Sequence, residues 1–121
     1  MSRLYTQDHE WIDVAGGEAT VGITDYAQGQ LGDVVFVDLP DAGRAVTKGG
    51  EAAVVESVKA ASDLYAPVAG TVVATNSGLD SAPESLNTAP YDGAWMLKLK
   101  LANPADVATL LDPDAYQKLL G

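Results

Sequence analysis

The chain contains no cysteine, and this absence excludes several kinds of chemistry. Structural disulfides, thiolate metal sites and cysteine nucleophiles all require a thiol group. Any thiol chemistry in this protein must therefore arrive on a cofactor. The chain also has a single histidine, His9. Because no second imidazole is available to share a metal ion, we predict no metal site.

Long hydrophobic runs are missing as well. No apolar segment approaches the roughly 20 residues that a helix needs to cross a bilayer. The first residues, Met1 to Tyr5, contain neither the apolar region of a signal peptide nor an Arg/Ser-rich transit pattern. We therefore expect a protein of the bacterial cytoplasm, although a processed protein of the mitochondrial matrix would look the same.

Basic residues are scarce. The chain has seven Lys and Arg against 17 Asp and Glu, and its formal net charge is −10 at pH 7. A surface of this sign disfavours nucleic acid and anionic membranes as partners. The charge leaves two interpretations open: it keeps the protein soluble, or it steers the protein toward basic patches on larger partners.

Short strand-like runs between glycine and proline turns dominate the pattern. Because 121 residues suffice for one modest core, we predict a single domain, 1–121, in the form of a β-sandwich or barrel, and we expect a monomer. Trp11, Phe36 and Trp95 are expected in its core. The predicted strands are His9–Val14, Ala19–Ile23, Val34–Leu39, a short one within Arg44–Thr47, Thr71–Thr75 and Trp95–Leu101.

Helix signals occur at one place early in the chain and at two places near its end. Thr24 and Asp25 are good N-cap residues for a short helix that Gly32 would end. Asn103-Pro104 and Asp112-Pro113 each combine a capping residue with proline, and predict short helices to Leu110 and Leu120. The apolar sides of this pair would be Leu110, Leu111, Leu119 and Leu120. Residues 76–92 read as an irregular loop with one helical turn.

One lysine stands between two apolar runs that are typical of a hairpin. The runs are Ala52–Val55 and Leu64–Val68, so Lys59 lies at or beside the tip. Most exposed lysines only add charge to the surface. Here Val58 and Ala60 place apolar side chains beside it, and Glu56 and Asp63 bracket it with negative charge. This environment makes Lys59 a candidate for a specific role.

The octet Glu56-Ser57-Val58-Lys59-Ala60-Ala61-Ser62-Asp63 closely resembles the lipoylation site of the glycine cleavage system H-protein family. Biotin carriers differ, because their lysine usually lies between two methionines. The lipoyl domains of 2-oxoacid dehydrogenases usually have Asp directly before the lysine, where this chain has Val58. Other pieces match in order along nearly the whole chain: His9–Trp11, Gly22–Ala27, Leu31–Val37, Leu39-Pro40 with Gly43, Pro67 with Gly70, Asn76 with Leu79, Pro83 with Asn87, Pro90-Tyr91 and Trp95-Met96.

The resemblance implies a fold and a task. The fold is mostly β, a single-domain hybrid of barrel and sandwich with short helices, two of them at the C-terminus. The task is that of a carrier without catalytic activity of its own, with lipoate in amide linkage on Lys59. The arm would accept the aminomethyl group from a pyridoxal-phosphate (PLP) glycine decarboxylase, present it to a folate-dependent aminomethyltransferase and be reoxidised by dihydrolipoamide dehydrogenase.

Further site residues follow from this expectation. A lipoate ligase or octanoyltransferase must choose Lys59 among the lysines, and we expect it to read Glu56, Ser57, Val58 and Ala60. The loaded arm is cationic and prone to hydrolysis, so carboxylates along its path would help to hold it. Our hypothesis assigns this to Glu10 and Asp63. The alternative is that both are solvated charges at strand ends.

Three other functions remain open at this point. The same lysine could serve a relay that hands octanoyl or lipoyl groups to 2-oxoacid dehydrogenases. The chain could instead be an unmodified β-sandwich interaction module, in which Lys59 has no role. A biotin carrier is a weaker alternative, because the flanking methionines are missing.

Overall fold

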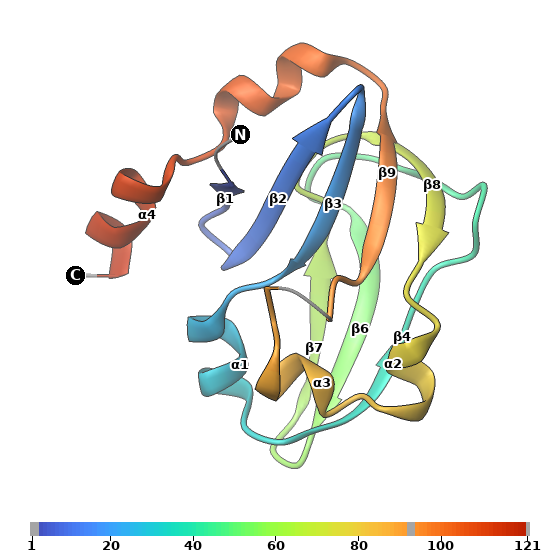
Figure 1. Cartoon of the computed structure of the whole chain (residues 1–121), viewed down its shortest axis with the longest axis vertical. Coiled ribbons are helices and arrows are strands. Elements are labelled where there is room, and N and C mark those ends of the chain that lie inside the picture. Colours follow the sequence, from blue (N-terminus) through green and yellow to red (C-terminus); the bar gives the residue numbers. More distant parts are fainter. Residues whose placement is uncertain (1–2, 92–93, 121) are drawn as a thin grey trace.

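The computed structural model describes residues 3–91 and 94–120, and two antiparallel sheets form its framework (Figure 1). In the six-stranded sheet the order is β1-β2-β3-β9-β8-β5, and in the three-stranded sheet it is β4-β6-β7. The strands are β1 (Leu4–Tyr5), β2 (Glu10–Ala15), β3 (Glu18–Ile23), β4 (Val34–Asp38), β5 (Ala45–Val46), β6 (Glu51–Ser57), β7 (Ala61–Tyr65), β8 (Gly70–Thr75) and β9 (Leu97–Leu101). The predicted class, mostly β with short helices, is confirmed; over the described ranges the sheets do not close into a barrel.

Short helices connect and flank the strands. They are α1 (Asp25–Leu31), α2 (Gly78–Ser81), α3 (Ser85–Thr88), the 3-10 helix η1 (Pro104–Thr109) and α4 (Pro113–Leu120). Thr24 caps α1 as predicted, because its hydroxyl accepts a hydrogen bond from the Ala27 N–H at 3.2 Å. Gly32 ends this helix with a φ of 78°, in the region that favours glycine. No helix in the described ranges is long and apolar enough to cross a membrane.

The core lies between the inner faces of the two sheets. Ile12 and Val21 face each other across β2 and β3, and both are fully buried. From the other sheet Val37 and Val55 form an equivalent pair across β4 and β6. Leu86 of α3 is fully buried against the same cluster. This alternation of inward apolar side chains is what positions the β6–β7 hairpin against the rest of the molecule.

The C-terminal helices occur where the proline signals predict them. Asn103 caps η1 by accepting the Ala105 N–H at 3.1 Å, and Asp112 caps α4 by accepting the Ala115 N–H at 2.7 Å. The first of these helices is of the 3-10 type. Leu119, expected on a packed face, is 46% exposed, so that expectation is wrong. Tyr116 is the side chain that α4 buries instead.

Other details of the sequence-based assignment also need correction. One helical turn was predicted in residues 76–92; the described part of this segment, 76–91, contains two, α2 and α3. Trp95 precedes β9 and is only half-buried, with the Lys98 ammonium 5.0 Å from its ring centroid. Phe36, expected in the core, is 49% exposed. A bulge in β4 between Val34 and Phe36 turns this side chain outward.

Trp11 is buried as predicted, and its position depends on a glycine. The indole N–H donates to the Pro90 carbonyl at 2.8 Å, and the ring lies over Gly22, the residue opposite Trp11 in the β2–β3 ladder. A Cβ added at Gly22 would lie 2.6 Å from Trp11 Cε2. The absence of a side chain at this position is therefore a packing requirement.

We expect Gly22→Ala to lower the free energy of unfolding by about 1–3 kcal/mol, because the indole must shift within a packed core. Gly29→Ala is the matched control: Gly29 lies in α1 with open space around it, and alanine there should stabilise by about 0.5–1 kcal/mol. Urea unfolding followed by tryptophan fluorescence measures both. Equal stability of the two variants would contradict the proposed packing.

Candidate functional site

Lys59 lies in the turn between β6 and β7. Figure 1 shows this turn at the lower end of the molecule. Ser57 shapes this turn. Its backbone N–H donates to the Ala60 carbonyl at 2.9 Å, and its hydroxyl accepts the N–H groups of Lys59 and Ala60 at 3.2 and 3.3 Å. The side chain of Lys59 is exposed. The turn therefore presents one amine to solvent from a defined backbone.

The turn is fixed to the segment between α1 and β4. The Val58 N–H donates to the Asp33 carbonyl at 3.0 Å. The stem of Lys59 passes beside Gly32, with Lys59 Cε 3.3 Å from the point that a Cβ there would occupy. Lys59 is thus held close to the end of α1, and any side chain at position 32 would crowd it.

Asn87 of α3 holds this connecting segment from the other side. Its amide donates to the Gly32 carbonyl at 2.8 Å, and its carbonyl accepts the Val34 N–H at 2.8 Å. The same amide donates to the Gln28 side chain at 3.0 Å. Sequence reasoning gave Asn87 no role at the site, because a separation of 53 to 59 residues leaves no local signal.

A cleft of about 360 Å³ lies between α1 and the inner face of the β6–β7 hairpin. Its polar lining includes Glu10 and Asp63, so the structure brings the two predicted carboxylates to one cavity. Asp63 is exposed and lies opposite Val54 across the β6–β7 ladder. The apolar part of the lining consists of Ile23, Ala27, Leu31, Val55 and Leu64. Such a mixture suits a flexible apolar chain that ends in a cation.

Glu10 is a buried carboxylic acid, with 2% of its surface exposed. One carboxylate oxygen accepts the Thr6 hydroxyl at 3.0 Å, and the other accepts the Tyr65 N–H at 2.9 Å. Burial raises the pKa of Glu10 to about 7; the two hydrogen bonds lower it by less, and nearby Asp8 raises it further. The group can therefore change its charge close to neutral pH.

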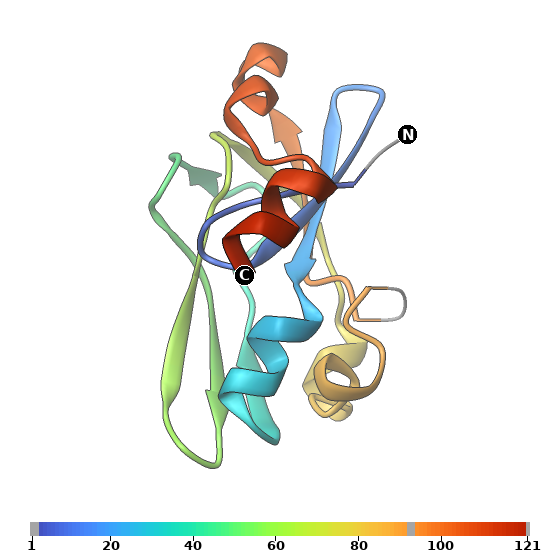
Figure 2. The same cartoon turned by 90° about the vertical axis from the view of Figure 1, so that its left-hand side faces the viewer.

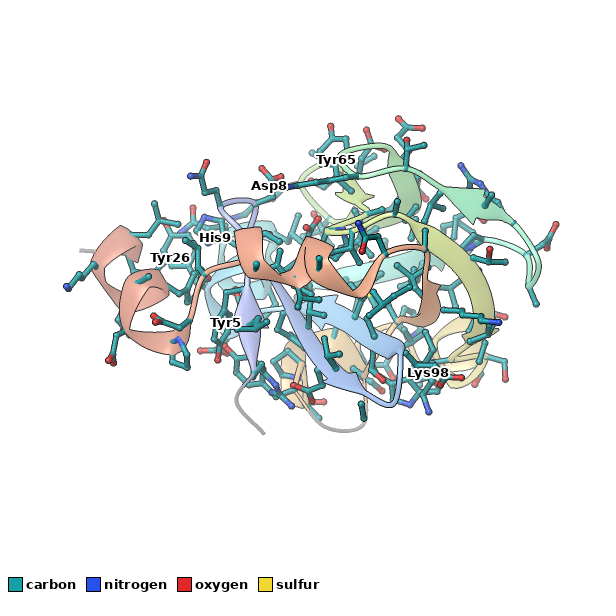
Figure 3. All side chains as sticks on the ribbon, turned by 90° about the horizontal axis from the view of Figure 1, so that it is seen from above. Tyr5, Asp8, His9, Tyr26, Tyr65 and Lys98 are labelled. Carbon is teal, nitrogen blue, oxygen red and sulfur yellow. The ribbon has the colours of Figure 1, made fainter. Side chains whose placement is uncertain are left out.

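His9, next to Glu10, is held by the C-terminal helix. Its Nδ1 lies 2.8 Å from the Tyr116 hydroxyl, which lies 2.8 Å from Thr24 Oγ1. The Tyr116 ring stacks on Tyr5 with centroids 4.5 Å apart. Figure 2 shows α4, in dark red, above α1. Figure 3 shows Tyr5, His9 and Tyr26 at the same end of the molecule. His9 has a φ of 66°, a left-handed conformation that these contacts stabilise.

The sequence predicts no metal site at His9 and gives no indication of the link between His9 and Tyr116. The 107 residues between the two leave no periodic pattern that could reveal it. The structure places His9 in the lining of the cleft, together with Asp8 and Tyr65. Among the residues that the structure describes, no group of three or more His, Asp or Glu could hold a metal ion.

Comparison with known proteins gives one consistent result. A family model described as "Glycine cleavage H-protein" matches residues 3–121. The glycine cleavage system H protein of Xanthobacter autotrophicus is 60% identical over 116 residues, which cover 96% of this chain and 93% of that protein. The H protein of Opitutus terrae is 61% identical over 118 residues, covering 97% and 93%.

A solved structure agrees with these sequence matches. The crystal structure of a glycine cleavage system H protein from Mycobacterium marinum superposes with a TM-score of 0.90. Its sequence identity is 39%, and the match covers 99% of this chain and 97% of that one. The similarity therefore extends over both sheets and the C-terminal helices.

The raised pKa of Glu10 predicts how stability changes with pH. The folded state binds the Glu10 proton more tightly than the unfolded chain does. The stabilisation that this proton gives to the folded state is therefore fully present below about pH 4.5 and is lost as pH rises through about 7. In Glu10→Gln the group no longer titrates. We therefore expect the free energy of unfolding of Glu10→Gln, relative to the parent protein, to increase between pH 5 and pH 8 by up to about 3 kcal/mol. A difference that stays constant over this range in urea titrations would contradict the assignment.

Proposed function

The chain belongs to the glycine cleavage H-protein family, whose members are carrier subunits of the glycine cleavage system, and on this premise we propose that it carries lipoate in amide linkage on Lys59. The proposal rests on the way in which the fold exposes the amine of Lys59 to solvent. Lys59 is exposed on a turn whose backbone is fixed by Ser57 on one side and by Asp33 on the other. A modification site needs this combination of access and fixed position.

The residues around Lys59 fit a lipoyl group. Lys59 would hold it covalently, and the apolar walls of the adjoining cleft, with Leu31 and Val55 among them, match its hydrocarbon chain. Lipoate attached there would supply a disulfide able to take up the aminomethyl group from a PLP-dependent glycine decarboxylase, present it to a folate-dependent aminomethyltransferase and be reoxidised by dihydrolipoamide dehydrogenase. The protein itself provides a tether that raises the effective concentration at each of these partners.

Glu10 and Asp63 would hold the loaded end of the arm. A cation in the cleft favours the ionised form of Glu10, so its entry would release a proton from the buried carboxylic acid. The Tyr65 N–H and the Thr6 hydroxyl keep the two oxygens of Glu10 in place. Asp63 is exposed on the same cavity and would add negative charge at its rim. The buried position of Glu10 also keeps water away from the group that it holds.

Attachment depends on an enzyme that selects this lysine. Exposed lysines are protonated at neutral pH, so a lipoate ligase or octanoyltransferase must supply both the base and the activated acyl group. Glu56, Val58 and Ala60 are exposed around Lys59 and can be contacted directly. Ser57 would act indirectly, through the shape of the turn.

The cellular setting is part of the proposal. The relatives named above are bacterial, which favours the bacterial cytoplasm over the mitochondrial matrix. We propose that the chain works as a monomeric single domain, because the turn with Lys59 must enter several different partners in succession.

Incubation with a lipoate ligase, ATP and lipoate should add one lipoyl group per chain, measured by intact mass and located by peptide mapping at Lys59. Lys59→Arg should abolish the addition, because arginine keeps the charge but offers no nucleophilic amine. Lys48→Arg, at another exposed lysine, is the control and should accept the group normally. Addition at any other lysine, or none at all, would refute the proposed attachment site.

Glu10→Gln should accelerate hydrolytic loss of the aminomethyl group from the loaded protein by up to about tenfold, because a charge-assisted hydrogen bond is removed. The rate is measured by mass spectrometry after separation from the decarboxylase. Glu18→Gln removes an exposed carboxylate at the distant end of β3 and should leave the rate unchanged. If Glu10→Gln behaves like this control, Glu10 has no part in holding the arm.

A further inference from the structure

An unusual group of apolar side chains is exposed beside Lys59. Among the described residues, the three most exposed large hydrophobic side chains are Val58, Val35 and Phe36, at 66%, 55% and 49%. They come from two segments that lie side by side. Phe36 faces Glu56 across the β4–β6 ladder, and the Val58 N–H bonds the Asp33 carbonyl. The three side chains therefore gather at the end of the three-stranded sheet that carries Lys59.

The backbone of β4 is irregular in the way that creates this exposure. In a regular strand successive side chains alternate between the two faces, so Val35 and Phe36 could not both point outward. The bulge between Val34 and Phe36 inserts an extra residue. As a result Val34 and Val37 both reach the core, at 3% and 1% exposure, while Val35 and Phe36 both face solvent. The core alone does not require two exposed apolar residues here.

Two carboxylates border these side chains. Asp33 precedes β4 and Glu56 lies opposite Phe36, and both are exposed. We call the surface formed by Val35, Phe36 and Val58, with Asp33 and Glu56, the tip patch. Its apolar centre and charged margin have the composition of a protein-binding surface. Its position is rigidly linked to Lys59, because the Val58–Asp33 hydrogen bond joins the turn to β4.

We propose that the tip patch is the docking surface for the enzyme that acylates Lys59, which would offer an apolar depression for Phe36 and a basic rim for Asp33 and Glu56. This inference rests on the proposed function and adds the surface by which the attaching enzyme is recognised. It extends the recognition site beyond the turn, to a strand that lies more than 20 residues earlier in the chain.

The short reach of the unmodified Lys59 side chain favours the acylating enzyme as the partner of the tip patch. In the acylation step the Lys59 nitrogen attacks the carbonyl of an acyl-adenylate; the amide bond forms, AMP leaves with the electron pair, and the proton of the amine passes to a base of the enzyme. Before this step the only spacer is the lysine side chain, so the enzyme must enclose the turn and cover its neighbours. Enzymes that act later are reached through the longer lipoyl arm and need less contact with the tip patch.

The charges of the tip patch support the same partner. Asp33 and Glu56 are both exposed, so a basic rim on the enzyme would pair with them as it docks. The formal net charge of −10 would also speed the encounter with a basic surface, in a salt-dependent manner.

The test uses the double variant Val35→Thr/Phe36→Thr with a lipoate ligase, lipoate and ATP, and follows lipoylation by intact mass. Threonine keeps the strand propensity of these exposed positions. We expect the KM for the acceptor protein to rise about tenfold or more, with kcat little changed, because an apolar anchor is lost from the interface. Val73→Thr is the matched control, since Val73 is an exposed strand valine of the other sheet, at 41%, and its KM should equal that of the parent protein.

Further measurements distinguish a loss of docking from misfolding of the variant and from failure of the proposed function. Thermal unfolding of the double variant should match that of the parent protein. Once lipoylated at high enzyme concentration, the variant should be reduced by dihydrolipoamide dehydrogenase with an unchanged KM. An unchanged KM for lipoylation would overturn the inference while leaving Lys59 as the attachment site, whereas absence of lipoylation in the parent protein would overturn the proposed function itself. Two results would show that the tip patch serves other partners and would also overturn the inference. One is an equal rise in KM with the lipoate ligase and with dihydrolipoamide dehydrogenase. The other is a dimer that the parent protein forms and the double variant does not.

Discussion

The hydrogen bond from the Val58 N–H to the Asp33 carbonyl is the constraint on which the site depends. A two-stranded hairpin is marginally stable by itself and its end would move freely. Here the end is joined to the segment between α1 and β4, and Asn87 holds that segment from the opposite side. The lysine, the cleft and the apolar surface of β4 therefore keep one geometry relative to each other. The proposed function would need this, because each partner would have to find the same amine or arm in the same place.

At Glu10, burial and hydrogen bonding have opposite effects on the charged carboxylate. Its burial makes the charged form unfavourable, and its two hydrogen bonds only partly offset this. A buried acid of this kind lowers the stability of the fold above neutral pH. In the proposed function, the same property would let Glu10 respond to a cation that enters the cleft, since the cation would restore the favourable interaction that water no longer provides. The proposed function and the stability of the fold would thus make opposite demands on this position.

Three departures from regular geometry lie around the cleft and the turn. His9 has a positive φ, Gly32 ends α1 in a conformation that favours glycine, and β4 carries a bulge next to Phe36. Each departure is stabilised by specific contacts, such as the Tyr116 hydroxyl at His9. Regular alternation from the buried Val34 would direct Phe36 toward the core. Local strain of this sort commonly marks functional parts of a protein.

The sequence alone is enough to predict the mostly β class, the capped helices and the place of Lys59 in a hairpin turn. These features depend on local patterns: alternation, capping residues and turn residues all act over a few positions. Three features appear only in the folded chain: the exposure of Phe36, the hydrogen bonds of Asn87 to the segment between α1 and β4, and the contact of Tyr116 with His9. Each of these depends on a bulge or on a contact between residues that are distant in the chain, and a single sequence carries no periodic signal for such contacts. The cleft follows the same rule: Glu10 and Asp63 are recognisable as acids, but their approach to one cavity results from how β2 and β7 pack.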